Sequence, residues 1–158
     1  MADAEFTAAR LRELLHYEPR TGKFTKRGKP VGFITGMGYE YLYLDKKSRL
    51  AHRMAWLYVY GELPKHQIDH INGVRTDNRI SNLRDVVPRV NNENKVKVRC
   101  DNKSSGMTGV SWHVHSAKWR ARIWQRGVEY RLGLFDTPEG ASDAYTEAKR
   151  RLHEGCTI

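Results

Sequence analysis

His66-Gln67-Ile68-Asp69-His70-Ile71-Asn72-Gly73 is the stretch that decides the fold, and Asp77-Asn78-Arg79, Asn82-Leu83 and Asn91-Asn92 follow it. The stretch puts a carboxylate beside a histidine on a short apolar strand that leads into a polar loop. A second apolar run, 83–87, predicts a second strand, and Pro88 then opens a helix because a first helical position needs no amide donor. This order of elements can bring Asp69, His70 and Asn91 together, although Asn91 lies 21 positions after His70.

These residue types suit metal-assisted hydrolysis of a phosphodiester. A hard divalent cation takes oxygen ligands, and one or two protein ligands leave positions for water and phosphate. The ion polarises the phosphoryl oxygen and stabilises the leaving alkoxide. A neutral imidazole, with an ordinary pKa of about 6.5, can accept a proton from the attacking water.

The motif resembles the HNH endonuclease signature of phage and intron-encoded homing enzymes. The resemblance is carried by Asp69-His70-Ile71-Asn72-Gly73, Asn78-Arg79, Asn82-Leu83 and Asn91. It implies an α+β chain with a ββα-metal nuclease domain that hydrolyses DNA to 5′-phosphate and 3′-hydroxyl ends. It further implies that His70 is the general base and that Asn82 braces the loop. One magnesium or manganese ion on Asp69 and Asn91 would stabilise the departing 3′ oxygen.

Other polar residues of the motif have simpler interpretations. His66 is expected to be solvated, and Asn72-Gly73 is expected to form a turn, since both residue types tolerate positive φ. Asn78 is expected to hydrogen-bond the loop backbone. His52 opens a helix and is assigned to packing or phosphate contact. Three arginines either pair with phosphates or remain solvated: Arg75, Arg79 and Arg84.

Composition favours a polyanionic partner. Lys plus Arg outnumber Asp plus Glu by 28 to 18, which gives a net charge of +10. No long apolar segment appears, so nucleic acid is favoured over a membrane, although a merely basic soluble protein remains open. The polar, acidic start, 1–7, does not read as a signal peptide. Cys100 and Cys156 form no CxxC pair, so neither a structural zinc nor a disulfide is expected, and the expected setting is the cytoplasm of a bacterium or phage-infected host.

The chain before the motif predicts a helix, 7–17, followed by a strand near Phe24. Tyr39, Tyr41 and Tyr43 alternate along another strand and are expected to be half-buried, with base stacking as the alternative. A turn is expected at 46–48, and a helix is expected over 51–60.

We divide the chain into a nuclease domain, 1–94, a basic linker, 95–105, and a DNA-binding domain, 106–158. The linker carries Lys95, Lys97 and Arg99, which would follow the phosphate backbone without reading sequence. A solvated tether is the alternative interpretation of the same charges.

Three runs with strand alternation follow, 109–115, 118–125 and 128–135, and Thr137-Pro138 then opens a helix. They predict a small three-stranded antiparallel sheet packed on one helix. Charge separates between the two: residues 106–131 carry a net +4 and residues 132–158 a net −2. The open face of the sheet is therefore expected to be basic.

This region resembles the DNA-binding domain of plant APETALA and ethylene-response factors. The matching runs are Ser105-Gly106-Met107-Thr108-Gly109-Val110, Trp119-Arg120-Ala121-Arg122-Ile123, Leu132-Gly133-Leu134-Phe135-Asp136-Thr137 and Ala141-Ser142-Asp143-Ala144-Tyr145. The likeness implies that seven residues face a DNA groove: Ser111, His113, Arg120, Arg122, Trp124, Glu129 and Arg131. The plant domain has arginine at 111, 113 and 129, so its target sequence does not carry over. Trp112 and Trp119 are expected in the core.

We therefore expect a site-preferring DNA endonuclease of the homing type, active as a monomer or weak dimer. A monomer has one such site, so nicking is its natural output, and a double-strand break needs a dimer or two events. Two other interpretations remain: a DNA-binding regulator with an inactive nuclease motif, and an RNA-binding protein whose basic sheet stacks single strands.

Overall fold

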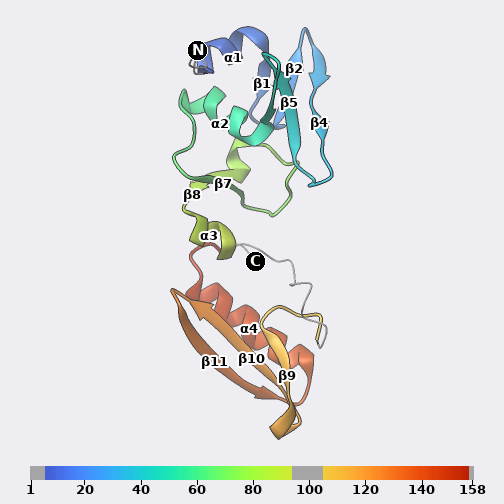
Figure 1. Cartoon of the computed structure of the whole chain (residues 1–158), viewed down its shortest axis with the longest axis vertical. Coiled ribbons are helices and arrows are strands. Elements are labelled where there is room, and N and C mark those ends of the chain that lie inside the picture. Colours follow the sequence, from blue (N-terminus) through green and yellow to red (C-terminus); the bar gives the residue numbers. More distant parts are fainter. Residues whose placement is uncertain (1–5, 94–104, 157–158) are drawn as a thin grey trace. The chain divides into compact units, whose positions relative to one another are not determined.

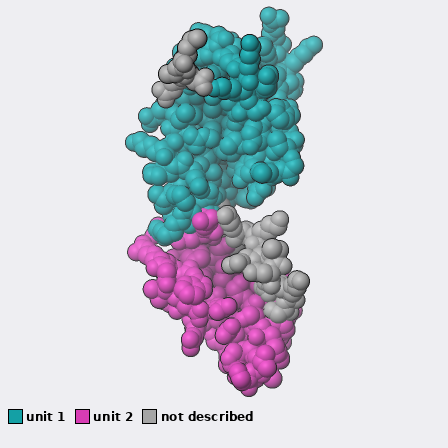
Figure 2. Space-filling model, viewed as in Figure 1, with its two compact units in different colours: residues 1–91 teal, residues 92–158 magenta. Residues whose placement is uncertain are grey.

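The structure, a computed structural model, describes residues 6–93 and 105–156. It is a mixed α and β structure with small antiparallel sheets (Figure 1). The chain divides into two compact units, residues 1–91 and 92–158 (Figure 2). Among the described residues, no helix is long and apolar enough to cross a membrane.

The first unit begins with helix α1 (Ala8–Leu14), which Thr7 caps by accepting a hydrogen bond from the Arg10 amide at 3.2 Å. A sheet of β1 (His16–Glu18), β2 (Lys23–Lys26) and β3 (Lys29–Val31) follows. The helix expected to reach Tyr17 stops at Leu14. Leu15 is extended and Tyr17 pairs with Phe24 across the hairpin, so strand pairing overrides the helical apolar pattern.

A second sheet contains β4 (Phe33–Ile34), β5 (Glu40–Leu44) and β6 (Lys47–Leu50). The turn lies one residue earlier than expected, at Asp45-Lys46, whose φ values of +46° and +63° suit a two-residue hairpin connection. β5 buries Leu42 and Leu44 rather than the tyrosines. Tyr39 and Tyr41 are partly buried, as expected, whereas Tyr43 is 67% exposed and departs from that expectation.

Helix α2 (Ala51–Tyr60) ends at Gly61, whose φ of +82° closes it in the left-handed region. Its buried face packs with α1 and the first two sheets into one apolar core. The core of this unit is built from Ala8, Leu11, Leu15, Tyr17, Phe24, Leu42, Leu44, Ala51, Met54, Ala55, Leu57, Ile68 and Leu83.

Residues 67–70 of the stretch 66–73 form strand β7 (Gln67–His70), and a long loop leads to a short 3-10 helix, η1 (Ile80–Asn82). Strand β8 (Leu83–Val86) then pairs antiparallel with β7, and helix α3 (Pro88–Glu93) follows. Ile68 and Leu83 fasten this hairpin to the core, because both side chains are buried in it.

The second unit has strands β9 (Val110–His113), β10 (Lys118–Gln125) and β11 (Val128–Phe135), in the order β11-β10-β9. A 3-10 turn, η2 (Val114–Ser116), joins the first two strands. Helix α4 (Pro138–Leu152) lies along one face of the sheet (Figure 1). Val110, Ala121 and Ala141 form the core between sheet and helix. Trp112, expected in the core, is 42% exposed, because β9 is an edge strand and the indole covers the edge of Trp119 at 5.1 Å.

Candidate active site

His70 ends strand β7 and is buried, with 5% of its surface exposed. Its Nε2 lies 3.3 Å from Oδ1 of Asn78. Burial lowers the pKa of His70, and the Asn78 contact and the charge of Asp69 oppose that effect. The ring is therefore neutral at neutral pH, which is the form that can accept a proton.

Asp69 precedes His70 and is also buried, at 6% exposure. Antiparallel register puts it opposite Arg84 of β8. The guanidinium donates from Nε and Nη2 to Oδ2 of Asp69, at 2.8 and 2.7 Å. A buried carboxylate requires such compensation. Arg84 is therefore a charge partner of Asp69. The sequence had left this arginine as a phosphate contact or a solvated residue.

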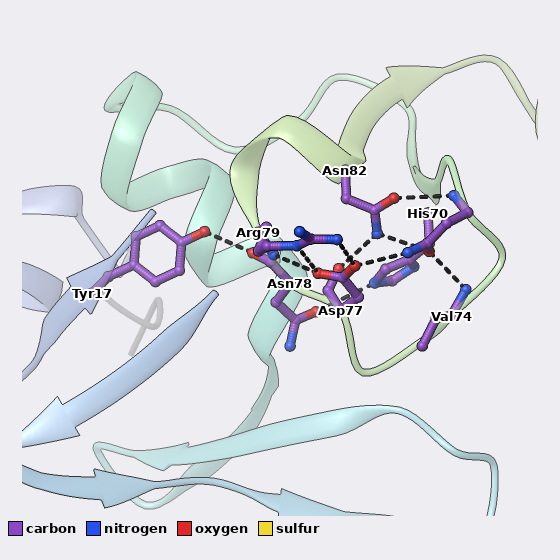
Figure 3. Close-up of polar contacts among 8 residues, drawn as sticks. Tyr17, His70, Val74, Asp77, Asn78, Arg79 and Asn82 are labelled. Atoms are coloured by element: carbon purple, nitrogen blue, oxygen red, sulfur yellow. Dashed lines mark hydrogen bonds and ion pairs between the residues drawn. The ribbon is translucent and has the colours of Figure 1, made fainter. Parts of the chain in front are cut away.

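The loop after His70 is held by its own side chains (Figure 3). Asn82 accepts a hydrogen bond from the Asn72 amide at 3.0 Å and donates from Nδ2 to the Asn72 side chain and the Asp77 carbonyl, at 3.0 and 2.8 Å. Asp77 in turn accepts from Arg79, and that contact lowers the pKa of Asp77 to about 2. The side chains thus fix the loop backbone around His70.

Residues from the N-terminal sheet support this loop from below. The Tyr17 hydroxyl donates to the Asn78 carbonyl at 2.6 Å, and the Ile80 amide donates to the Pro19 carbonyl at 3.3 Å. Gly22 comes so close that a Cβ there would lie 2.4 Å from the Arg79 amide nitrogen. The loop therefore rests directly on the hairpin between β1 and β2.

Two aromatic rings surround His70. His52 of α2 meets it edge-on with centroids 5.1 Å apart, and Tyr39 lies 6.1 Å from it. Burial, followed by repulsion from His70 when that ring is protonated, lowers the pKa of His52 to about 3. Its Nδ1 is buried and has no hydrogen-bond partner among the described residues. This arrangement matches the packing role expected for His52.

Asn91 lies on α3 and donates from Nδ2 to Oε1 of Gln67 at 2.9 Å. Gln67 and Asp69 are two residues apart on β7, so strand alternation puts them on the same side. The hydrogen bond to Gln67 thus places Asn91 on the face of β7 that carries Asp69.

The donor chemistry of Asp69 and Asn91 fits a hard divalent cation. A carboxylate and an amide oxygen are ligands that magnesium accepts while it keeps several waters. Within residues 6–93 and 105–156, no group of three or more His, Cys, Asp or Glu side chains could hold a metal by itself. A cation bound here would therefore have few protein ligands and would compete with Arg84 for the Asp69 carboxylate.

In the second unit, strand register puts the seven expected groove residues on the sheet face opposite α4. Ser111 pairs with Arg120, and a bulge after Ala121 aligns Arg122 with Arg131 and Trp124 with Glu129. Trp124 is 56% exposed. Arg120 Nη2 donates to Ser111 Oγ at 3.3 Å, while the His113 ring contacts Ser116 Oγ at 3.1 Å. The open face therefore carries arginine, histidine and indole side chains.

Glu129 moderates the charge of that face, because Arg122 and Arg131 both approach its carboxylate, at 3.4 and 3.6 Å. The expected linker contacts, Lys95, Lys97 and Arg99, lie outside the described residues.

Besides the Tyr17 and Arg84 contacts, sequence reasoning missed a contact between Asn78 and Glu40. Glu40 of β5 accepts a hydrogen bond from Nδ2 of Asn78 at 2.8 Å. Glu40 lies 38 residues from Asn78 in a strand of another sheet, and no motif or spacing links them. Only the packing of the second sheet against the loop brings them together.

Comparisons with known proteins bear on the same segment. Residues 49–93 match the model of the HNH endonuclease family, so the chain carries an HNH endonuclease domain there, and this match supports a DNA endonuclease. The chain is also similar to Protein 3.8 of Escherichia phage T7, with 29% identity over 108 residues that cover 68% of this chain and 87% of that protein. No solved structure matches significantly. The family match ends at residue 93, so the likeness of the second unit to the plant DNA-binding domain rests on its sequence motifs.

Proposed function

We propose that this chain is a metal-dependent DNA endonuclease of the homing type, with a nuclease domain, 1–94, a linker, 95–105, and a DNA-binding domain, 106–158. The observation that carries the proposal is the buried, neutral His70 beside Asp69 at the end of β7, within the segment that matches the HNH family. The pairing of β7 with β8 ahead of α3 supports a ββα-metal arrangement.

Each residue then has a role that its contacts support. His70 accepts the proton of the attacking water. Asn82 holds the loop that follows His70, through its bonds to Asn72 and Asp77. Asp69 and Asn91 would hold a magnesium or manganese ion, which when bound supplies positive charge to the phosphate and the leaving oxygen.

The open face of the β9–β11 sheet would bind duplex DNA. A small β-sheet can enter the major groove, where one arginine can donate two hydrogen bonds to the edge of a guanine. Arg120, Arg122 and Arg131 supply cations on that face, and Ser111 and His113 supply polar groups. The exposed Trp124 offers apolar area.

The test is plasmid nicking by the purified full-length chain. Supercoiled plasmid is incubated with the protein and Mg²⁺ or Mn²⁺, with and without EDTA, and the cut ends are labelled. We expect nicked circles with 5′-phosphate and 3′-hydroxyl ends in metal, and intact plasmid in EDTA. Cleavage that continues in EDTA would refute a metal-dependent mechanism.

A DNA-binding protein without cleavage is the second candidate. The two hydrogen bonds from Arg84 to Oδ2 of Asp69 favour it, because a guanidinium already neutralises the expected metal ligand. Duplex binding in a gel-shift assay without nicking in either metal would support this alternative. Preferential competition by RNA in the same assay would instead support an RNA-binding protein.

A further inference from the structure

The side chain of Asn78 lies between two residues from other segments of the first unit. It is 1% exposed. Its Nδ2 lies 2.8 Å from Oε2 of Glu40, and its Oδ1 lies 3.3 Å from Nε2 of His70. The Tyr17 hydroxyl fixes the backbone of the same residue. Asn78 therefore links a carboxylate on β5 to the imidazole on β7.

We propose that Glu40 is a positioning residue that selects the neutral tautomer of His70 through the amide of Asn78. A carboxylate only accepts hydrogen bonds, so the NH₂ group of Asn78 must face Glu40. The amide oxygen then faces His70, and because this oxygen also only accepts, Nε2 of His70 must donate. A neutral imidazole carries one proton, so its lone pair is on Nδ1.

The opposite amide orientation is unfavourable in this setting. It would set the Asn78 oxygen against the Glu40 carboxylate and leave two acceptors facing each other in a buried space. Such unpaired buried acceptors are strongly disfavoured. The charge of Glu40 thus determines the orientation of the amide, and the amide determines which imidazole nitrogen is protonated.

The surroundings of Glu40 hold its carboxylate in place. Only 12% of its side chain is exposed, and Lys23 Nζ lies 4.0 Å from Oε2. Gly32, with φ +127°, passes over the carboxylate, and a Cβ there would lie 2.7 Å from Oε1. The glycine therefore leaves room that a side chain would fill.

The catalytic consequence rests on the proposed function, because it makes Nδ1 the nitrogen that accepts the proton of water. The tautomer itself does not depend on catalysis, so it can be measured without DNA or metal. A histidine in the wrong tautomer presents an N–H to the water and cannot act as a base.

The experiment is a long-range ¹H–¹⁵N correlation spectrum of the full-length chain labelled with ¹⁵N-histidine at neutral pH. The His70 signals are assigned by their loss in His70→Gln. We expect the Nε2–H tautomer in the wild type. In Glu40→Gln, which keeps the size of the side chain but can either donate or accept, a measurable fraction should shift to Nδ1–H. Glu13→Gln, at an exposed ion pair with Arg10, is the matched control and should leave the His70 signals unchanged.

Two results would overturn the inference: an Nδ1–H tautomer in the wild type, or an unchanged Nε2–H tautomer in Glu40→Gln. In the nicking assay, Glu40→Gln should lower the rate at saturating DNA by the same factor as the Nε2–H population of His70 falls in the spectrum. A chain that shows the expected tautomers but never nicks would refute the proposed function and leave the tautomer assignment standing.

Discussion

The loop between β7 and η1 and the open face of the β9–β11 sheet are both rich in polar side chains, but they use them differently. In the loop, Asn72, Asp77 and Asn82 bond to one another at 2.7–3.0 Å. On the sheet, the contacts of Arg120, Arg122 and Arg131 are longer, at 3.3–3.6 Å.

The difference reflects what each surface is for in our proposal. A proton acceptor must be held in one orientation before the substrate arrives, so the polar side chains of the loop hydrogen-bond to one another. A DNA-binding face must offer donors to phosphates and bases, so its bonds within the protein stay weak. Substitutions in the loop should therefore change the rate or the stability, and those on the sheet should change affinity.

The largest effect should come from His70→Ala. Loss of the general base should lower the nicking rate at saturating DNA by about 10²- to 10⁴-fold. Duplex affinity, measured by gel shift in EDTA, should stay the same, because the sheet is unaltered. Nicking by the variant at the wild-type rate would remove His70 from the mechanism.

Acid should destabilise the first unit through His52. The folded-state pKa of His52 is lowered from 6.5 to about 3, so the unfolded chain binds this proton first. The destabilisation due to His52 is therefore absent above about pH 6.5 and grows as pH falls toward 3. There it lowers the unfolding free energy by about 4 kcal/mol.

Urea unfolding at several pH values measures this dependence. His52→Gln cannot be protonated, so its stability should fall less between pH 6.5 and 3 than that of the wild type. Parallel pH profiles for the two proteins would contradict the prediction.

Gly22→Ala should disturb the support of the loop. It forces an L residue to φ +72° and brings its Cβ within 2.5 Å of the backbone of Asn78 and Arg79. We expect a loss of about 3 kcal/mol in unfolding free energy, from backbone strain and displacement of packed main chain. Gly28→Ala is the matched control, because it has φ +74° with nothing within 4 Å and should lose about 1 kcal/mol. Equal losses in the two variants would show that the close approach is unimportant.

On the sheet, Arg120→Ala or Arg122→Ala should weaken binding to the preferred duplex by about 1–3 kcal/mol if the side chain reads a base. The preferred site would first be mapped by sequencing the ends of cleaved DNA. Gel shifts across a range of salt concentrations then separate the two kinds of contact. Equal weakening on all sequences, with a flatter salt dependence, would assign the arginine to phosphates alone.

Much of this fold follows from local patterns in the sequence. Proline and threonine mark the start of α4, and alternation marks β10 and β11, because these signals act over a few residues. The loop contacts of Asn82 also lie within ten positions of it. The exposure of Trp112 could not be predicted, because it depends on β9 being an edge strand.

The candidate site could be predicted only as far as its motif reaches. Asp69, His70 and Asn82 lie in one short segment, whereas Glu40 and Tyr17 reach the site from strands 38 and 61 residues away from Asn78. Such contacts follow from how separate sheets pack together. The pairing of Arg84 with Asp69 depended on the register of two strands, which the alternation alone left open.

The hydroxyl of Tyr17 that meets the Asn78 carbonyl belongs to a strand outside the segment that matches the HNH family, 49–93. That segment is therefore not portable by itself. A transfer of residues 49–93 into another protein would carry the signature residues but not the β1–β2 hairpin that supports them. The motif residues would then be present without their native conformation, unless residues 16–44 were transferred as well.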